Sequence, residues 1–296
     1  MAKPFDPSAT MSDGVAPQKN RPDAVPVQTL KAYEDVAFLK TDVCRPVRLQ
    51  LEFLRPEALM QANNIKSTIV LFGSARIPDP DTATARYREA QLKLAAAPDN
   101  AHCQLALRQA KRHCEMSHYY TVAREFASLV SRTSQTEEAC DFVIMTGGGG
   151  GIMEAGNRGA DDVSAKSVGL NITLPYEQKP NPFITPELVF QFHYFSIRKM
   201  HFLMRAKALC CFPGGYGTMD ELFECLTLIQ TRKISPIPVV LFGREFWEGL
   251  INWQRFVDDG LINAADLNMI HYCETAQEAW DFIRNFWKTN GKTTPS

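Results

Sequence analysis

Two glycine-rich turns contain the residue types that bind anions. Residues 146–152 (TGGGGGI) follow the apolar run 142–145, and residues 213–218 (PGGYGT) follow the apolar run 208–212. Glycine lets successive backbone N–H groups approach an anion, and a helix that begins behind such a turn adds a partial positive charge. The two turns together predict a phosphate-binding site. The alternative is that both turns only connect a strand to a helix.

Neither turn fits the common nucleotide motifs. Counted from Gly147, the third glycine position of the dinucleotide motif G-x-G-x-x-G is Ile152, and counted from Gly215 it is Asp220. The stretch 151–158 lacks the Lys-Ser/Thr pair that completes the triphosphate motif. The sequence therefore favours a phosphomonoester ligand over a dinucleotide or a triphosphate.

Charged side chains near the two turns could bind and react with such a ligand. Arg198 and Lys199 supply cations for a phosphate, and Glu221 follows the second glycine turn. We expect Glu221 and Glu154 to lie in the first turns of the helices that follow the two glycine turns. The helix dipole stabilises a carboxylate in that position without any chemical role, so this simpler explanation stays open for Glu221.

These residues need a scaffold in which strands alternate with helices. Short apolar runs that end at turns predict buried parallel strands. Between them, residues 81–133 read as helical with a break at 98–100 and a new start at Ser117, and a helix is expected from about Met219 to Thr231. Helices from Glu245 and Ala276 close the chain, and Thr218 is expected to cap the helix behind it. The predicted strands are 67–73, 142–145, 167–173, 188–193, 208–212 and 237–242.

This alternation predicts an α/β fold with a Rossmann-like, doubly wound parallel sheet in a single domain. Ligands bind such sheets beyond the carboxyl ends of the strands. A third turn with Gly73 and Ser74 follows the first predicted strand, so three turns at one sheet edge would outline one site. We expect a disordered tail over 1–28, a helical extension over 29–66 with short helices interrupted by Pro46 and Pro56, and a catalytic domain over 67–290.

Composition narrows the class of protein further. The 296 residues carry a net charge of −1, which argues against a basic nucleic-acid binder. We find neither an apolar run long enough for a membrane span nor an export signal, so a cytoplasmic location is the default. The eight cysteines show neither C-x-x-C nor zinc-site spacing, and we expect most of them to be buried thiols.

Three of these features together resemble one known family. Residues 213–221 (PGGYGTMDE) match the pattern P-G-G-x-G-T-x-x-E, Arg198-Lys199 lies at the matching upstream position, and the glycine loop 148–153 precedes both. From about Ser67 to Trp253 the chain thus resembles the LONELY GUY family of cytokinin riboside 5′-monophosphate phosphoribohydrolases, many of which were labelled lysine decarboxylases. It looks like the longer bacterial-type branch, because residues 1–66 have no counterpart in compact members and the segment 77–141 is longer than theirs.

The resemblance implies hydrolysis of the N-glycosidic bond of a nucleoside 5′-monophosphate, such as AMP or a cytokinin riboside monophosphate, to the free base and ribose 5-phosphate. It implies no cofactor, no metal, and a homodimer or a higher homo-oligomer in which a neighbouring subunit often completes the site. It makes Arg198 and Glu221 the catalytic pair. The substrate-binding residues expected from the turns and from the resemblance are Gly73, Ser74, Gly148, Gly149, Gly150, Gly151, Met153, Glu154, Lys199, Gly214, Gly215, Gly217 and Thr218.

Two other functions stay open. A carrier of a nucleotide or of molybdopterin would use similar glycine turns without turnover, and a nucleosidase of nucleotide salvage would accept purine and pyrimidine monophosphates broadly. The decarboxylase label finds no support, because a pyridoxal enzyme needs a Schiff-base lysine and no motif singles one out. In every case the expected partner is a small nucleotide, neither a nucleic acid nor a membrane.

Overall fold

A computed structural model describes residues 29–136, 140–173 and 179–290. The tail predicted for residues 1–28 lies outside the described residues. By its contacts the chain divides into two compact units, one ending at Arg48 and one beginning at Leu49. The first unit contains α1 (Val36–Leu39) and the short 3₁₀ turn Asp42–Cys44, and α2 (Arg45–Ala62) runs across the boundary.

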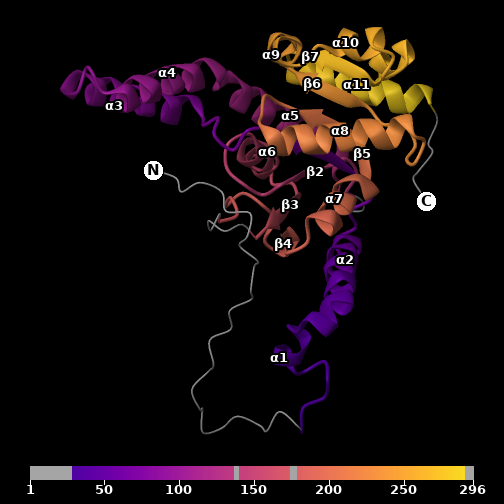
Figure 1. Cartoon of the computed structure of the whole chain (residues 1–296). Helices are drawn as coiled ribbons and strands as arrows, with labels where there is room; N and C mark the ends of the chain where they lie inside the picture. The colour runs from indigo at the N-terminus through magenta and orange to yellow at the C-terminus, as the bar shows by residue number, and fades with distance from the viewer. Residues whose placement is uncertain (1–28, 137–139, 174–178, 291–296) are drawn as a thin grey trace, which may run out of the picture. The chain divides into compact units, whose positions relative to one another are not determined.

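The second unit contains a seven-stranded sheet in which every neighbouring pair of strands is parallel (Figure 1). Its strand order is β4-β3-β2-β1-β5-β6-β7, so the order reverses between β1 and β5. This is the doubly wound α/β fold that the sequence predicted. The strands are β1 (Thr68–Phe72), β2 (Val143–Thr146), β3 (Ser167–Ile172), β4 (Val189–Phe192), β5 (Ala206–Cys211), β6 (Val239–Phe242) and β7 (Ile270–Cys273).

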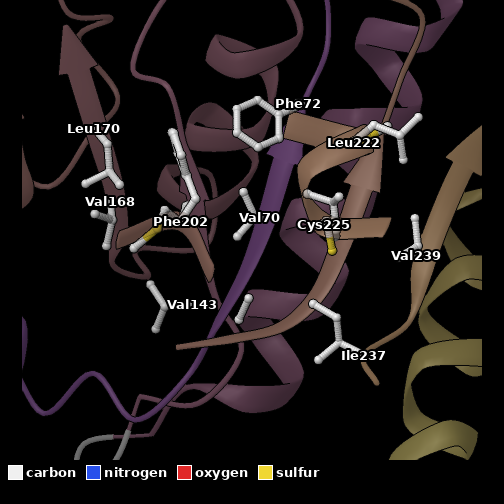
Figure 2. Packing of buried hydrophobic residues seen from close by; sticks show 14 of the residues in the cluster. Val70, Phe72, Val143, Val168, Leu170, Phe202, Leu222, Cys225, Ile237 and Val239 are labelled. Carbon is white, nitrogen blue, oxygen red and sulfur yellow. The ribbon is translucent and has the colours of Figure 1, made fainter. Parts of the chain in front are cut away.

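Helices cover both faces of this sheet. Residues of α2, α7, α8 and α9 pack on the face that carries Val70 and Phe72, and Figure 2 shows Phe202, Leu222 and Cys225 on that side. Residues of α5, α6 and α11 pack on the opposite face. The helices that follow α2 are α3 (Pro80–Ala96), α4 (Ala101–Met116), α5 (His118–Ser134), α6 (Ile152–Asp161), α7 (Phe195–Met204), α8 (Tyr216–Gln230), α9 (Arg244–Leu250), α10 (Trp253–Asp258) and α11 (Ala276–Thr289).

The six predicted strands are present with small shifts at their ends, and the helical break expected at 98–100 separates α3 from α4. The Asn100 side chain accepts hydrogen bonds from the N–H groups of His102 and Cys103 and so starts α4. The two helices lie side by side as a hairpin (Figure 1). Six of the eight cysteines are buried and all eight are free thiols, as the composition predicted.

Three predictions of secondary structure were wrong. First, α2 is continuous through Pro56, because the helix tolerates the loss of one N–H, and Pro46 lies in its first turn, where an N–H has no intrahelical partner. Second, β7 was missed, since IHYC alternates in burial and is short. Third, α8 begins at Tyr216 instead of Met219, because the N–H groups of Thr218 and Met219 already bond to the Gly215 carbonyl.

Candidate functional site

A cavity of about 660 Å³ opens at the carboxyl ends of β1 and β5, where the strand order reverses. This is the position at which doubly wound sheets bind ligands. The Ser74 backbone joins the three turns around it: its N–H donates to the Pro213 carbonyl at 3.0 Å, and its carbonyl accepts from the Ile152 N–H at 3.1 Å. Predicted site residues that line the cavity are Gly73, Ser74, Met153, Arg198, Gly214, Gly215, Gly217, Thr218 and Glu221.

The turn at the N-terminus of α8 forms one wall of this cavity. Gly215 is the N-cap of α8, and no side chain caps the helix there, so the prediction that Thr218 caps it was wrong. Because α8 begins at Tyr216, Glu221 lies in its second turn and not in the first. The helix dipole alone therefore accounts less well for a carboxylate at this position, since its effect is confined to the first turn.

The first glycine turn is held from behind by buried polar side chains. Gly148 and Gly151 have φ values of +74° and +64°, which glycine adopts without strain. The Gly148 N–H donates to Thr146 Oγ1 at 3.0 Å, and Asn181 Nδ2 donates to the carbonyls of Gly148 at 3.2 Å and Gly149 at 3.0 Å. Asn157 Oδ1 accepts from both Thr146 and Asn181, so one fully buried amide ties the supports together.

Arg198 of α7 is fixed in place before any ligand arrives. Its Nε donates to the Leu170 carbonyl at 2.8 Å, and its guanidinium lies 4.9 Å from the centroid of the Phe202 ring. A Cβ added at Gly147 would lie only 2.7 Å from Arg198 Nη2, so the guanidinium reaches the first glycine turn. Burial lowers the pKa of Arg198, whereas Glu221 raises it. A guanidinium nevertheless stays protonated in proteins, so a preoriented cation faces the cavity.

Glu221 is a buried carboxyl, only 5% exposed, in the wall of the same cavity. Burial raises its pKa from the ordinary 4.5 to about 7, against the lowering effects of Arg198 and Lys199. A carboxyl with a pKa near neutrality can exchange a proton in either direction at physiological pH. Arg198 and Glu221 thus form an electrostatically coupled pair at one cavity.

The other predicted site residues lie outside the cavity lining. Lys199 Nζ forms ion pairs with Asp220 at 2.9 Å and Glu224 at 3.0 Å. Glu154 lies in the first turn of α6, as the sequence predicted, and its Oε1 accepts a hydrogen bond from the Tyr120 hydroxyl at 2.9 Å. The remaining members of this group are Gly148, Gly149, Gly150 and Gly151.

Sequence reasoning missed several residues of the cavity wall, among them Arg76, His113 and Met116. Arg76 follows the β1 turn, and its N–H donates to Ser74 Oγ at 3.1 Å. His113 and Met116 belong to α4, within the segment 77–141. No local pattern marks α4 as a wall of the site, because its placement depends on how the α3–α4 hairpin packs.

The raised pKa of Glu221 predicts a pH-dependent stability. The folded state binds the Glu221 proton more tightly than the unfolded state between pH 4.5 and about 7, so this group lowers stability as the pH rises through that window. The shift corresponds to about 3 kcal/mol of stability, which the folded protein loses in full once the pH exceeds about 7. Denaturation of the wild-type and Glu221→Gln proteins at pH 5 and pH 8 should show that the variant loses less stability on going to pH 8. Equal losses would contradict the raised pKa.

The chain is similar to several known proteins. Residues 153–283 match a family model described as "Possible lysine decarboxylase". Two probable cytokinin riboside 5′-monophosphate phosphoribohydrolases of Oryza sativa subsp. japonica are similar to this chain. The first is 28% identical over 46% of this chain and 59% of the rice protein. The second is 31% identical over 30% of this chain and 43% of the rice protein. The chain thus spans about half the length of these relatives.

A solved molybdenum cofactor binding protein from the phototrophic bacterium Rippkaea orientalis aligns with 57% of this chain and 87% of its own, at 17% identity and a TM-score of 0.42. Within the described residues, the helices are too short or too polar to cross a membrane.

The matches to the family model and to the two rice proteins confirm the family resemblance found in the sequence.

Proposed function

From the premise that this chain is a relative of the cytokinin riboside 5′-monophosphate phosphoribohydrolases, we propose that it hydrolyses the N-glycosidic bond of a nucleoside 5′-monophosphate. Water adds at C1′ of the ribose, the C1′–N bond breaks, and the products are the free base and ribose 5-phosphate. The observation that carries the proposal is the buried carboxyl of Glu221, which shares a cavity with Arg198 and with the open N-terminus of α8.

The phosphate is best held at the N-terminus of α8. The turn 213–218 and the turn at Gly73 border the cavity, and the helix dipole favours an anion at this end. This contact is remote from the bond that breaks, so its binding energy serves to orient the ribose. A phosphomonoester fits such a site better than a longer phosphate chain, because the triphosphate motif is absent.

Glu221 and Arg198 then act at the sugar and the base. Breaking the C1′–N bond builds positive charge on the ribose, and a carboxylate beside C1′ stabilises that charge. Glu221 in its ionised form supplies the charge or orients the attacking water. Arg198, held by the Leu170 carbonyl, neutralises phosphate or donates a hydrogen bond to the departing base.

The test is to incubate the purified protein with AMP and measure adenine and ribose 5-phosphate. We expect adenosine, which lacks the phosphate, to react at least about 100-fold more slowly, because the remote contact that orients the sugar is missing. Equal rates on AMP and adenosine would contradict a phosphate site at α8. Tight binding of AMP without release of adenine would instead favour a carrier.

Base preference is a separate question. Rates on AMP, GMP, CMP and isopentenyl-AMP, measured under the same conditions, distinguish a cytokinin-activating enzyme from a broad nucleosidase of salvage. Similar kcat/KM values on all four would favour the broad nucleosidase.

A further inference from the structure

The helix that carries Arg198, α7, contacts α2 at both of its ends. The part of α2 from Leu49 onward belongs to the same compact unit as the sheet and α7. Two carboxylates of this part, Glu52 and Glu57, reach the N-cap and the C-cap residues of α7. No role for either residue follows from the glycine turns or from the family motif.

Glu52 binds the backbone at the N-cap of α7. Tyr194 is the N-cap residue of α7 and makes no side-chain capping bond. The carboxylate of Glu52 accepts hydrogen bonds from the backbone N–H groups of His193 at 2.8 Å and Tyr194 at 3.1 Å. A carboxylate at this end also interacts favourably with the helix dipole. The N-cap of α7, four residues before Arg198, is thus held by a side chain from another element.

Glu57 holds the other end of α7. Arg205 is the C-cap residue, and its Nη2 lies 2.7 Å from Glu57 Oε2, while its Nη1 donates to the Ile65 carbonyl at 3.1 Å. His201, fully buried on the last turn of α7, has its Nδ1 atom 3.5 Å from Glu57 Oε1. Its ring centroid lies 5.3 Å from that of Phe53 of α2. These contacts tie the C-terminal end of α7 to α2.

We propose that Glu52 and Glu57 are positioning residues, which set the place of the Arg198 guanidinium in the cavity by holding α7. The inference rests on the proposed function, because it assumes that Arg198 acts on the nucleotide. Two contacts define the position of the Arg198 guanidinium: its Nε donates to the Leu170 carbonyl, and the guanidinium lies over the Phe202 ring. A small shift of α7 breaks this arrangement, and displacements of about 1 Å can reduce turnover by about 100-fold.

The first test compares Glu52→Ala with a matched control, Glu278→Ala. Glu278 also accepts two backbone N–H bonds at a helix start, from Glu274 at 3.0 Å and Thr275 at 3.1 Å, but its helix, α11, carries none of the candidate site residues. We expect both variants to lower Tm by similar amounts. Only Glu52→Ala should lower kcat/KM, by about 10-fold or more. Equal activity of the two variants would overturn the proposal.

The second test asks whether Glu52 acts through Arg198. If it does, the effect of Glu52→Ala should divide between kcat and KM in the same way as the effect of Arg198→Ala does. In the Arg198→Ala background, Glu52→Ala should then lower kcat/KM further by less than about twofold. A full, additive loss in that background would show a general structural role and overturn the proposal. Glu52→Gln, which keeps one acceptor oxygen, should recover part of the activity.

The two proposals fail in distinguishable ways. If the wild-type protein releases adenine and Arg198→Ala strongly lowers but does not eliminate kcat/KM, whereas Glu52→Ala behaves like Glu278→Ala, only the positioning role is wrong. If the wild-type protein neither hydrolyses AMP nor binds ribose 5-phosphate in calorimetry, both the proposed function and the positioning role are wrong. If it binds ribose 5-phosphate without turnover, the same pair of variants compared by binding affinity decides the positioning role.

Discussion

Replacing Glu221 with glutamine should reduce the release of adenine from AMP by about 1000-fold or more. Glutamine keeps the shape of the side chain but can neither carry the negative charge that stabilises the ribose nor exchange a proton. Because burial disfavours the charge of Glu221, the variant should be at least as stable as the wild type at pH 8. Chromatography of the released base measures the loss of rate, and thermal unfolding at pH 8 measures the stability.

A second glutamate of α8 supplies the control. Glu224 lies one turn further along the helix, outside the lining of the cavity, and pairs with Lys199. Glu224→Gln makes the same chemical change on the same helix, and we expect a much smaller loss of rate. Near-normal hydrolysis by Glu221→Gln would contradict the assignment of the carboxyl.

Replacing Arg198 with lysine should lower kcat/KM on AMP by about 100-fold although the charge is kept. A lysine ammonium carries all of its N–H donors on one nitrogen, so it cannot bond to the Leu170 carbonyl and present a second nitrogen to the cavity, as the arginine fork does. The expected outcome is therefore a cation in the wrong place. Steady-state kinetics on AMP, with circular dichroism to verify folding, measure the effect.

Arg124→Lys is the matched control for this prediction. Arg124 also makes a two-pronged contact, with both oxygens of Asp162, and it lies outside the cavity lining. Its replacement by lysine should leave kcat/KM close to that of the wild type. An Arg198→Lys enzyme as active as Arg124→Lys would show that charge alone is needed at position 198.

The sheet and its turns could be predicted because their determinants are local. Apolar runs such as 167–173 are buried strands, and the glycine turns follow directly after strands, so the sequence alone places them at one edge. Parallel pairing then brings Gly73, the first glycine turn and Gly214 together without further information. The backbone bonds of Ser74 complete what those patterns imply.

The supports of the site could not be predicted, because they depend on contacts between distant segments. Asn181 is 33 residues from Gly148, whose carbonyl it holds, and Glu52 is 141 residues from His193. Neither lies in a motif. An asparagine inside a helix is a weak signal for a buried partner, and Asn157 of α6 shows such partners in Thr146 and Asn181. The helical period of α2 predicts a helix but not the helix against which it packs.

The most direct measurement is a crystal structure of the Glu221→Gln variant soaked with AMP. We expect the phosphate at the N-terminus of α8, between the turns at Gly73 and Gly214, with the glutamine amide beside C1′ and the Arg198 guanidinium in contact with the nucleotide. A nucleotide bound elsewhere, or one whose C1′ lies out of reach of residue 221, would contradict the account.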